Sequence, residues 1–288
     1  TNGTLSLNDT GEGIAVTNNS TLTGGTEVSI TSSGAFDLEG TGTQISATSG
    51  GVNVNATGAA SLKEGTILSS RRATISGAGV SLSDGLKLGS DDKKINGLTV
   101  NSNGAALSVS DVNVVSTGSV QMNSDTGIAI SGTNSITSTG SSIALSATGN
   151  TDITVDGSTS LSASIGSTLS GKSVIANNGS TITGSMGDLT LSGTDSVTVN
   201  GSVKTMADTS TLSLTGGSVD VNTDLDTAGI ASISGTTVET NAIKAGKNVA
   251  VNGSTSATVA GKITATDGSV SATGGTVTVG DIAANTTA

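Results

Sequence analysis

Short stretches in which every second residue is aliphatic recur along the whole chain. Seven clear examples are Thr4–Leu7, Val28–Thr31, Val52–Asn55, Val80–Ser83, Asp188–Leu191, Val249–Asn252 and Thr276–Val279. Successive side chains of a β-strand point to opposite faces, so each stretch has one apolar face and one face rich in Ser, Thr or Asn. The Gly, Asn, Asp and Ser residues between the stretches are typical of turns. The pattern predicts an all-β protein with almost no helix.

In the C-terminal third the aliphatic positions return at a nearly constant interval. One track is Val197, Val219, Val238, Ala257 and Val277. A second is Val203, Leu225, Ile243, Ile263 and Ile282, and a third is Leu214, Ile233, Val251 and Val270. Three interleaved tracks with a common period of about 20 residues indicate three strands per repeat, and short repeats of this kind stack into a coil.

These repeats predict a parallel, three-sided β-solenoid (β-helix) of about 20 residues per turn and roughly fourteen turns. We expect a right-handed coil, because parallel strand connections are right-handed. A single turn buries too few aliphatic side chains to offset the entropy of ordering it, so stacking must provide the stability. The absence of proline agrees with this fold, since each strand must donate hydrogen bonds to a neighbour.

The N-terminal half keeps the alternation but loses the strict period. Its track of Leu5, Val28, Val52, Val80, Leu98 and Val120 has steps between 18 and 28 residues. We therefore expect longer corners there. No hinge or change of composition interrupts the chain, so the sequence predicts a single continuous solenoid over residues 1–288, less regular over 1–187 and most regular over 188–288.

Composition excludes several kinds of chemistry. The 288 residues include no Pro, Cys, His, Trp or Tyr, and Phe36 is the single aromatic residue. His/Cys zinc sites, cysteine nucleophiles and Ser-His-Asp triads are therefore impossible, and we predict neither a cofactor nor a catalytic residue. A net charge of −11 disfavours nucleic acid and anionic membranes as partners. Thr1 opens the chain without a signal peptide, so we expect a mature protein or an excised segment.

Paired carboxylates are the remaining catalytic candidates. They are Asp91 with Asp92, Asp152 with Asp156, and Asp220 with Asp224 and Asp226. Polysaccharide-degrading sites combine such groups with basic and aromatic residues, whereas aspartate is also common in turns. We interpret these residues as solvated turn residues. We predict no metal site, because the last group lacks the Gly-Gly-x-Gly-x-Asp pattern of calcium-binding coils.

Six of the eleven basic residues lie within 32 positions of one another: Lys63, Arg71, Arg72, Lys87, Lys93 and Lys94. On a solenoid they would form a local patch that contacts an acidic face of a neighbouring molecule or an anionic glycan. A plain solvated corner is the simpler interpretation. If the patch is an interface, reversing the charges of Arg71 and Arg72 should weaken lateral association.

Thr-aliphatic-Thr triplets could indicate an ice-binding face. Examples are Thr21–Thr23, Thr181–Thr183 and Thr276–Thr278. Ice-binding solenoids stack such triplets in every turn, but here Ser, Asn, Asp and Lys intervene. Ordinary β-propensity explains the triplets.

Several segments resemble the shaft repeats of filamentous haemagglutinin-type exoproteins, the β-helical adhesins of two-partner secretion. The segments are Gly201–Val203, Gly217–Val221, Gly246–Val251 and Gly268–Ala272, which share a Gly-x-Val/Leu-x-Val/Ala pattern at a spacing of about 20 residues. The resemblance covers residues 188–288 best. It implies a secreted or surface-displayed rod that acts in adhesion, aggregation or biofilm cohesion.

We therefore expect a non-enzymatic, extracellular β-solenoid that serves as an adhesin shaft or as a subunit of a filament or biofilm matrix. Expected partners are further copies, end to end or side by side, or glycans and proteins of host or bacterial surfaces. One alternative is a polysaccharide-binding or polysaccharide-degrading β-helix with a groove of converging Asp and Lys side chains. The other is an ice-binding solenoid with one flat, Thr-rich face.

Overall fold

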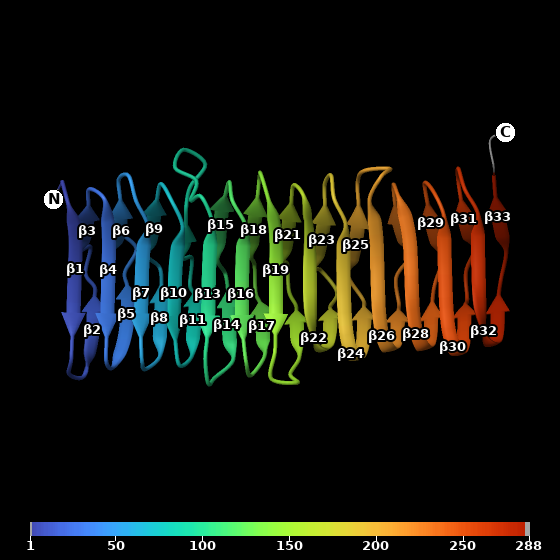
Figure 1. Cartoon of the computed structure of the whole chain (residues 1–288), viewed down its shortest axis with the longest axis horizontal. Helices are drawn as coiled ribbons and strands as arrows, with labels where there is room; N and C mark the ends of the chain where they lie inside the picture. Colours follow the sequence, from blue (N-terminus) through green and yellow to red (C-terminus); the bar gives the residue numbers. More distant parts are fainter. Residues whose placement is uncertain (1, 286–288) are drawn as a thin grey trace. The chain divides into compact units, whose positions relative to one another are not determined.

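The computed structural model of the chain describes residues 2–285 and divides into two compact units, residues 1–150 and 151–288. The described residues form strands and no helix, and they coil into about 13 turns roughly 22 residues apart (Figure 1). The predicted parallel β-solenoid is therefore confirmed. Its turns are longer and fewer than the predicted values of about 20 residues and roughly fourteen turns, because several corners carry extra residues. The single continuous domain stays a prediction.

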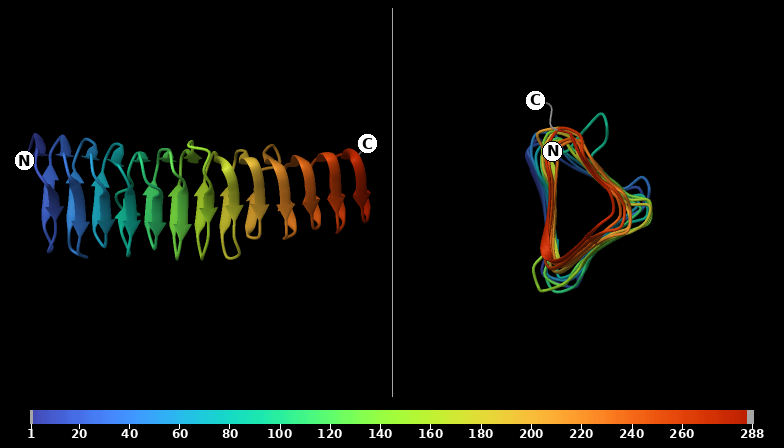
Figure 2. Two further views of the ribbon diagram at one scale, coloured as in Figure 1. Left: turned by 90° about the horizontal axis from the view of Figure 1, so that it is seen from below. Right: turned by 90° about the vertical axis from the view of Figure 1, so that its right-hand side faces the viewer.

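In the first unit each complete turn contains three short strands, one on each side of the coil (Figure 2). The first side contains β1 (Thr4–Asp9), β4 (Glu27–Ser32), β7 (Val52–Ala56), β10 (Ala73–Gly77), β13 (Leu98–Ser102), β16 (Val120–Ser124) and β19 (Ser142–Ala147). The second side contains β2 (Gly13–Val16), β5 (Ala35–Glu39), β8 (Ala60–Lys63), β11 (Val80–Ser83), β14 (Leu107–Ser110) and β17 (Ile128–Ser131). The third side contains β3 (Thr21–Gly24), β6 (Gln44–Ala47), β9 (Thr66–Ser69), β12 (Lys87–Leu88), β15 (Asn113–Ser116) and β18 (Ser135–Ser138).

In the second unit the strands of the first and second sides are joined into long single strands. After β20 (Ile153–Val155) on the second side and β21 (Ser160–Ala163) on the third, the long strands are β22 (Gly166–Ala176), β24 (Leu189–Val199), β26 (Thr211–Val221), β28 (Ile230–Thr240), β30 (Val249–Val259) and β32 (Val270–Val279). The third side continues with β23 (Thr181–Gly184), β25 (Ser202–Thr205), β27 (Leu225–Thr227), β29 (Ile243–Ala245), β31 (Ile263–Ala265) and β33 (Ile282–Ala284).

Within each unit, equivalent strands pair in parallel and their inward side chains form aliphatic ladders. One ladder of the first unit is Val28, Val52, Ala73, Leu98 and Val120, all fully buried. The first predicted track, Val197, Val219, Val238, Ala257 and Val277, is a ladder of the second unit. Full burial of a Val or Leu side chain of these ladders contributes about 1.5–3 kcal/mol. The core of each unit therefore runs through the middle of its coil.

Phe36 occupies the interior of the first unit. Its ring is fully buried on β5, and its ladder neighbours are Ile14 on one side and Ala60 on the other. The small alanine leaves space for the large ring. Complementary volumes of this kind keep the interior close-packed.

One predicted N-terminal position is wrong. The sequence track placed Val80 after Val52 on the same side of the coil, but Val52 pairs with Ala73, and Val80 lies on the second side in β11. Alanine is a weak hydrophobic signal, so the sequence pattern favours the bulkier valine seven residues later as the inward position. Part of the apparent irregularity of the N-terminal half comes from this error.

One C-terminal position is also wrong. Val251 pairs with Ala272 rather than with Val270. The side chains of a strand repeat every two residues, so a shift of two positions keeps the same inward face and cannot be detected from hydrophobicity.

The corner between the second and third sides requires left-handed backbone. In the first unit the residues that adopt it include Asn18, Asn19, Glu64, Asp84, Asp111 and Gly132, with φ of 59°, 61°, 59°, 56°, 58° and 76°. In the second unit Gly157 and Gly179 adopt positive φ at the equivalent corner, with values of 67° and 88°. Residues other than Gly, Asn and Asp rarely adopt this conformation. The corner thus includes three acidic side chains in the first unit.

Candidate functional site

The structure divides the six basic residues of the predicted patch between two corners. Lys63, at the end of β8, and Lys87, at the start of β12, flank the corner between the second and third sides. The other four lie around the corner between the third and first sides and are exposed: Arg71, Arg72, Lys93 and Lys94. Four of the six are therefore gathered at one corner, and two are not.

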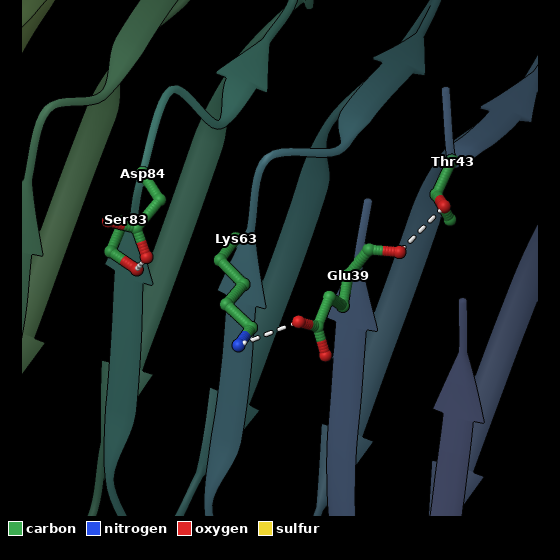
Figure 3. A network of polar contacts seen from close by, with 5 residues as sticks. All are labelled: Glu39, Thr43, Lys63, Ser83 and Asp84. Atoms are coloured by element: carbon green, nitrogen blue, oxygen red, sulfur yellow. Dashed lines mark hydrogen bonds and ion pairs between the residues drawn. The ribbon is translucent and has the colours of Figure 1, made fainter. Parts of the chain in front are cut away.

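Lys63 forms an ion pair with a residue of the same unit. Its Nζ lies 2.9 Å from Glu39 Oε1 on the neighbouring β5 (Figure 3). The hydrogen bond to Glu39 raises the pKa of Lys63 above its ordinary value of 10.5. Thr43 Oγ1 donates to the Glu39 carbonyl at 2.7 Å, and one turn further Ser83 Oγ donates to Asp84 Oδ2 at 2.9 Å. This corner is a local polar network in which Lys63 already has a partner.

The two arginines at the other corner differ in their contacts. Arg72 Nη1 donates to Thr99 Oγ1 at 2.8 Å and Nη2 donates to Ser119 Oγ at 3.3 Å, so this guanidinium reaches across two successive turns. The Arg71 side chain instead lines a shallow hollow of about 420 Å³ that also contains Glu27. Arg72 therefore helps to fix this corner, whereas Arg71 faces solvent.

A loop projects from the same corner between β12 and β13 (Figure 1). A hollow of about 530 Å³ lies against this loop. The Ser90 amide donates to the Lys93 carbonyl and the Lys93 amide donates to Ser90 Oγ, both at 3.0 Å, which closes the loop on itself. Leu68, an outward-facing residue of β9, contributes apolar surface to the hollow. The charged residues of the loop also line it: Asp91, Asp92, Lys93 and Lys94.

These four charges are not neutralised by ion pairs. Among residues 2–285, no oppositely charged group lies within 4.0 Å of any of them. We name the hollow and its four charged residues the socket. The socket thus combines an apolar surface with charges of both signs, and the two flanking arginines give this corner an excess of positive charge.

The predicted pair Asp152 and Asp156 binds backbone amides. Asp152 Oδ1 accepts a hydrogen bond from the Ser173 amide at 3.1 Å, and Asp156 Oδ1 accepts one from the Gly157 amide at 2.7 Å. These contacts are typical of turn-stabilising aspartates. The two carboxylates therefore have structural roles in the turns.

The third acidic group is spread over two sides of the coil. Asp220 lies on the second side in β26, whereas Asp224 and Asp226 lie before and within β27 on the third side. Asp224 accepts a hydrogen bond from the Ala242 amide at 3.3 Å, and Asp226 forms an ion pair with Lys244 at 3.4 Å. Within the described part of the chain, no three His, Cys, Asp or Glu side chains gather in a way that could hold a metal ion.

The Thr triplets do not build a uniform face. On the third side of the second unit, Thr181 and Thr183 are followed in the next turn by Ser202 and Lys204. A lysine at this position interrupts the flat array of hydroxyl groups that an ice-binding surface would present.

Three large apolar side chains are exposed at the corner between the third and first sides of the second unit. Ile165, Met186 and Met206 have exposed fractions of 54%, 66% and 60%. The Met186 amide donates to the Ser164 carbonyl at 2.8 Å and the Met206 amide donates to the Gly184 carbonyl at 2.9 Å, which places them on successive turns. We name these three residues the apolar ridge. Sequence reasoning missed it, although their spacing of 21 and 20 residues matches the repeat.

A ladder of asparagine side chains was also missed. Asn200 Nδ2 donates to Asn177 Oδ1 at 3.2 Å, and Asn222 Nδ2 donates to Asn200 Oδ1 at 2.8 Å. Asn241 Nδ2 then donates to the Asn222 carbonyl at 2.8 Å. The near-regular spacing of these asparagines in the sequence was the available signal. Their amides hold the successive corners of the second unit together.

Comparisons with protein-family models, with curated proteins and with solved structures find no match to this chain. Among the described residues, no helix is long and apolar enough to cross a membrane.

Proposed function

We propose that this β-solenoid is a structural protein of the cell exterior, an adhesin shaft or a subunit of a filament or biofilm matrix, in which copies stack end to end. The observation that carries the proposal is the exposure of inward-facing ladder positions in the first and last described turns. Open ends of a solenoid present unpaired strand edges, which are templates for further strands.

The C-terminal end of the second unit is the clearer case. Val277 on β32 and Ile282 on β33 continue ladders whose other members are buried, but their own exposed fractions are 42% and 56%. In the first described turn of the first unit, Leu5, Leu7 and Ile14 are only half-buried. Inward-facing ladder positions are therefore less buried in the first and last described turns than in the turns between them.

Each strand of the first turn has a counterpart in the last turn on the same side of the coil. The first turn contains β1, β2 and β3 on the first, second and third sides, and the last turn contains β32 on the first two sides and β33 on the third. In the proposed contact, β1 and β2 of one copy pair with β32 of another, and β3 pairs with β33. The aliphatic ladders then continue across the junction.

Electron microscopy tests this proposal with a matched pair of variants. Val277→Asp/Ile282→Asp places two carboxylates on the ladder positions, whereas Thr278→Asp/Ala283→Asp places them on adjacent, outward-facing positions of the same strands. We expect filaments from the wild type and from the outward-facing variant, and single molecules from the ladder variant. Monomeric wild-type protein at high concentration, or equal assembly of the two variants, would contradict the proposal.

The extracellular location and the adhesive role are further parts of the proposal. They are supported by the resemblance to shaft repeats and by polar outer faces rich in Ser, Thr and Asn. Antibody labelling of intact cells of the source organism, compared with permeabilised cells, tests the location. Labelling that requires permeabilisation would place the protein inside the cell.

Polysaccharide binding is a second candidate function, because Asp and Lys side chains converge on the socket. A titration with polygalacturonate, followed by calorimetry, tests it on the wild type and on Lys93→Ala/Lys94→Ala. Saturable binding that the double substitution abolishes would favour this function.

A further inference from the structure

We infer that the socket receives the apolar ridge of a second copy of this chain, which joins copies side by side. The inference deepens the proposed structural function and rests on it, since lateral contacts serve a protein that assembles. Two surface features have no role in stabilising the solenoid, and the inference pairs them with each other. They are the exposed apolar ridge and the apolar hollow whose charged residues form no ion pair.

The ridge has the character of an interaction surface. Among the described residues, five large apolar side chains are strongly exposed, and the two outside the ridge belong to the end turn discussed above. Successive turns of a solenoid lie about 4.8 Å apart, so the three ridge residues form a continuous apolar strip. Methionine is unbranched and polarisable and adapts to irregular cavities, which suits it to a docking surface.

The socket offers a complementary apolar surface. Leu68 points outward from β9, and its ladder neighbour on β6 is the polar Ser46. An outward leucine is therefore unusual on this side, and it remains half-buried because it lines the hollow beneath the charged loop. A volume of about 530 Å³ is sufficient for one inserted methionine side chain with its neighbouring backbone. Insertion of Met186 would cover Leu68 and displace water from both.

The charged residues around the socket and the ridge also favour contact between these two surfaces. The corner that holds the socket contains four basic side chains and three acidic ones: Arg71, Arg72, Lys93, Lys94, Glu27, Asp91 and Asp92. Three exposed charged residues, Asp188, Lys204 and Asp208, lie within two residues of the ridge methionines in the chain. The corner around the socket therefore has a small excess of positive charge and the ridge a small excess of negative charge, so the two surfaces are complementary. This complementarity favours the apolar ridge of a second copy as the partner of the socket.

The contact joins two different surfaces, so a copy can use its socket and its ridge with different neighbours. Contacts of this kind generate rings where the rotation closes and open arrays where it does not. The inference therefore predicts lateral association that increases with protein concentration.

A charge-swap experiment tests the pairing directly. Lys93→Glu/Lys94→Glu makes the socket acidic, and Asp188→Lys/Asp208→Lys makes the ridge basic. Each variant alone should need a roughly tenfold higher concentration for lateral association, because like charges then face each other. An equimolar mixture should regain wild-type association, because each altered surface meets a surface of opposite charge. Sedimentation velocity measures the association in each case.

Matched controls separate the contact from net charge. Lys87→Glu/Lys262→Glu and Asp37→Lys/Glu239→Lys produce the same charge changes at exposed positions elsewhere. Asp188 Oδ1 accepts a 2.7 Å hydrogen bond from the Thr211 amide, so the double ridge variant loses this bond. Asp208→Lys alone keeps it and serves as the second ridge variant. Thermal melts confirm that every variant is folded.

The measurements are made in the Val277→Asp/Ile282→Asp background, where end-to-end stacking is blocked and the association that remains is lateral. In this background Met186→Ser should also weaken association. The inference is overturned if the socket variant associates like its charge control, if the mixture fails to regain association, or if polygalacturonate binds the socket without competing with association. Absence of filaments with lateral association intact would overturn the end-to-end proposal alone.

Discussion

The two units differ in how the chain turns at the corner between the first and second sides. In the first unit a loop separates β13 from β14 and another separates β16 from β17, whereas in the second unit single strands such as β24 and β30 run through the corner. The long strands place a glycine at the bend in every turn. These glycines are Gly171, Gly193, Gly216, Gly235, Gly253 and Gly274.

The glycines at this corner serve two different needs. In the first unit Gly104 and Gly127 have φ of 128° and 115°, which other residues rarely adopt. At Gly253 in the second unit the constraint is space: a Cβ there would lie 1.8 Å from the Ser256 carbonyl oxygen. The comparison shows that a solenoid corner is built either by unusual backbone angles in a loop or by close backbone approach within a strand.

Replacement of Gly253 by alanine should have the largest effect. The added methyl group clashes with backbone that belongs to the same strand, so we expect a loss of about 2–3 kcal/mol in the free energy of unfolding of the second unit. Gly104→Ala should cost the first unit about 1–2 kcal/mol, because its nearest contact is 3.4 Å away and only the backbone angle is unfavourable. Hydrogen exchange measures the two units separately.

Gly3→Ala is the control for both, since no atom lies within 4 Å of the added carbon. It should leave both units unchanged. If Gly253→Ala costs no more than Gly104→Ala, the second unit relaxes around the methyl group and the distinction between the two kinds of corner fails.

Sequence reasoning was most successful where the turns are uniform in length. The track from Val197 to Val277 matches the register because the nearly constant spacing locates even the small Ala257. It failed at Ala73, whose small side chain gives a weak hydrophobic signal, although it is fully buried. Hydrophobicity reports which face is inward but not the exact register, so corner insertions and two-residue shifts escape it.

The surface features were harder to predict. Proximity in sequence grouped Lys63 with Lys93, but the width of the third side separates the corners on which they lie. Met186 and Met206 were overlooked because exposed apolar residues look like core residues in a sequence. Their exposure depends on corner geometry, which the repeat period alone does not determine.

Substitution of Glu64 by glycine sharpens the comparison at the corner between the second and third sides. Glu64 has a φ of 59°, where the second unit uses glycines, so removing its Cβ should stabilise the first unit by about 1 kcal/mol. Hydrogen exchange of β8 and β9 measures the gain. Glu64→Ala is the control, because it removes the carboxylate but keeps the Cβ. Equal stabilities of the glycine and alanine variants would show that the backbone angle carries no strain.

The smallest expected effect is on stability at low pH. Because of the acidic residues at this corner, the first unit should lose more stability in acid than the second unit. The Thr133 amide, at 2.7 Å from Asp111 Oδ1, and then Ser110 Oγ lower the pKa of Asp111 below its ordinary value of 3.8. A carboxyl group whose pKa is lower in the folded state adds stability above pH 3.8, and this stability is lost as the pH falls through the folded value. The second unit has glycines at the equivalent positions Gly157 and Gly179.

Hydrogen exchange of β14 and β15 between pH 5 and pH 2 tests this difference. The wild-type first unit should lose stability below pH 3.8, and Asp111→Asn should lose less. Asparagine tolerates the left-handed backbone at this position, so the variant isolates the charge. A parallel loss of stability in the wild type and the asparagine variant would assign the acid sensitivity to other carboxylates. It would leave Asp111 with the role in the first unit that glycine has in the second, to provide left-handed backbone and no more.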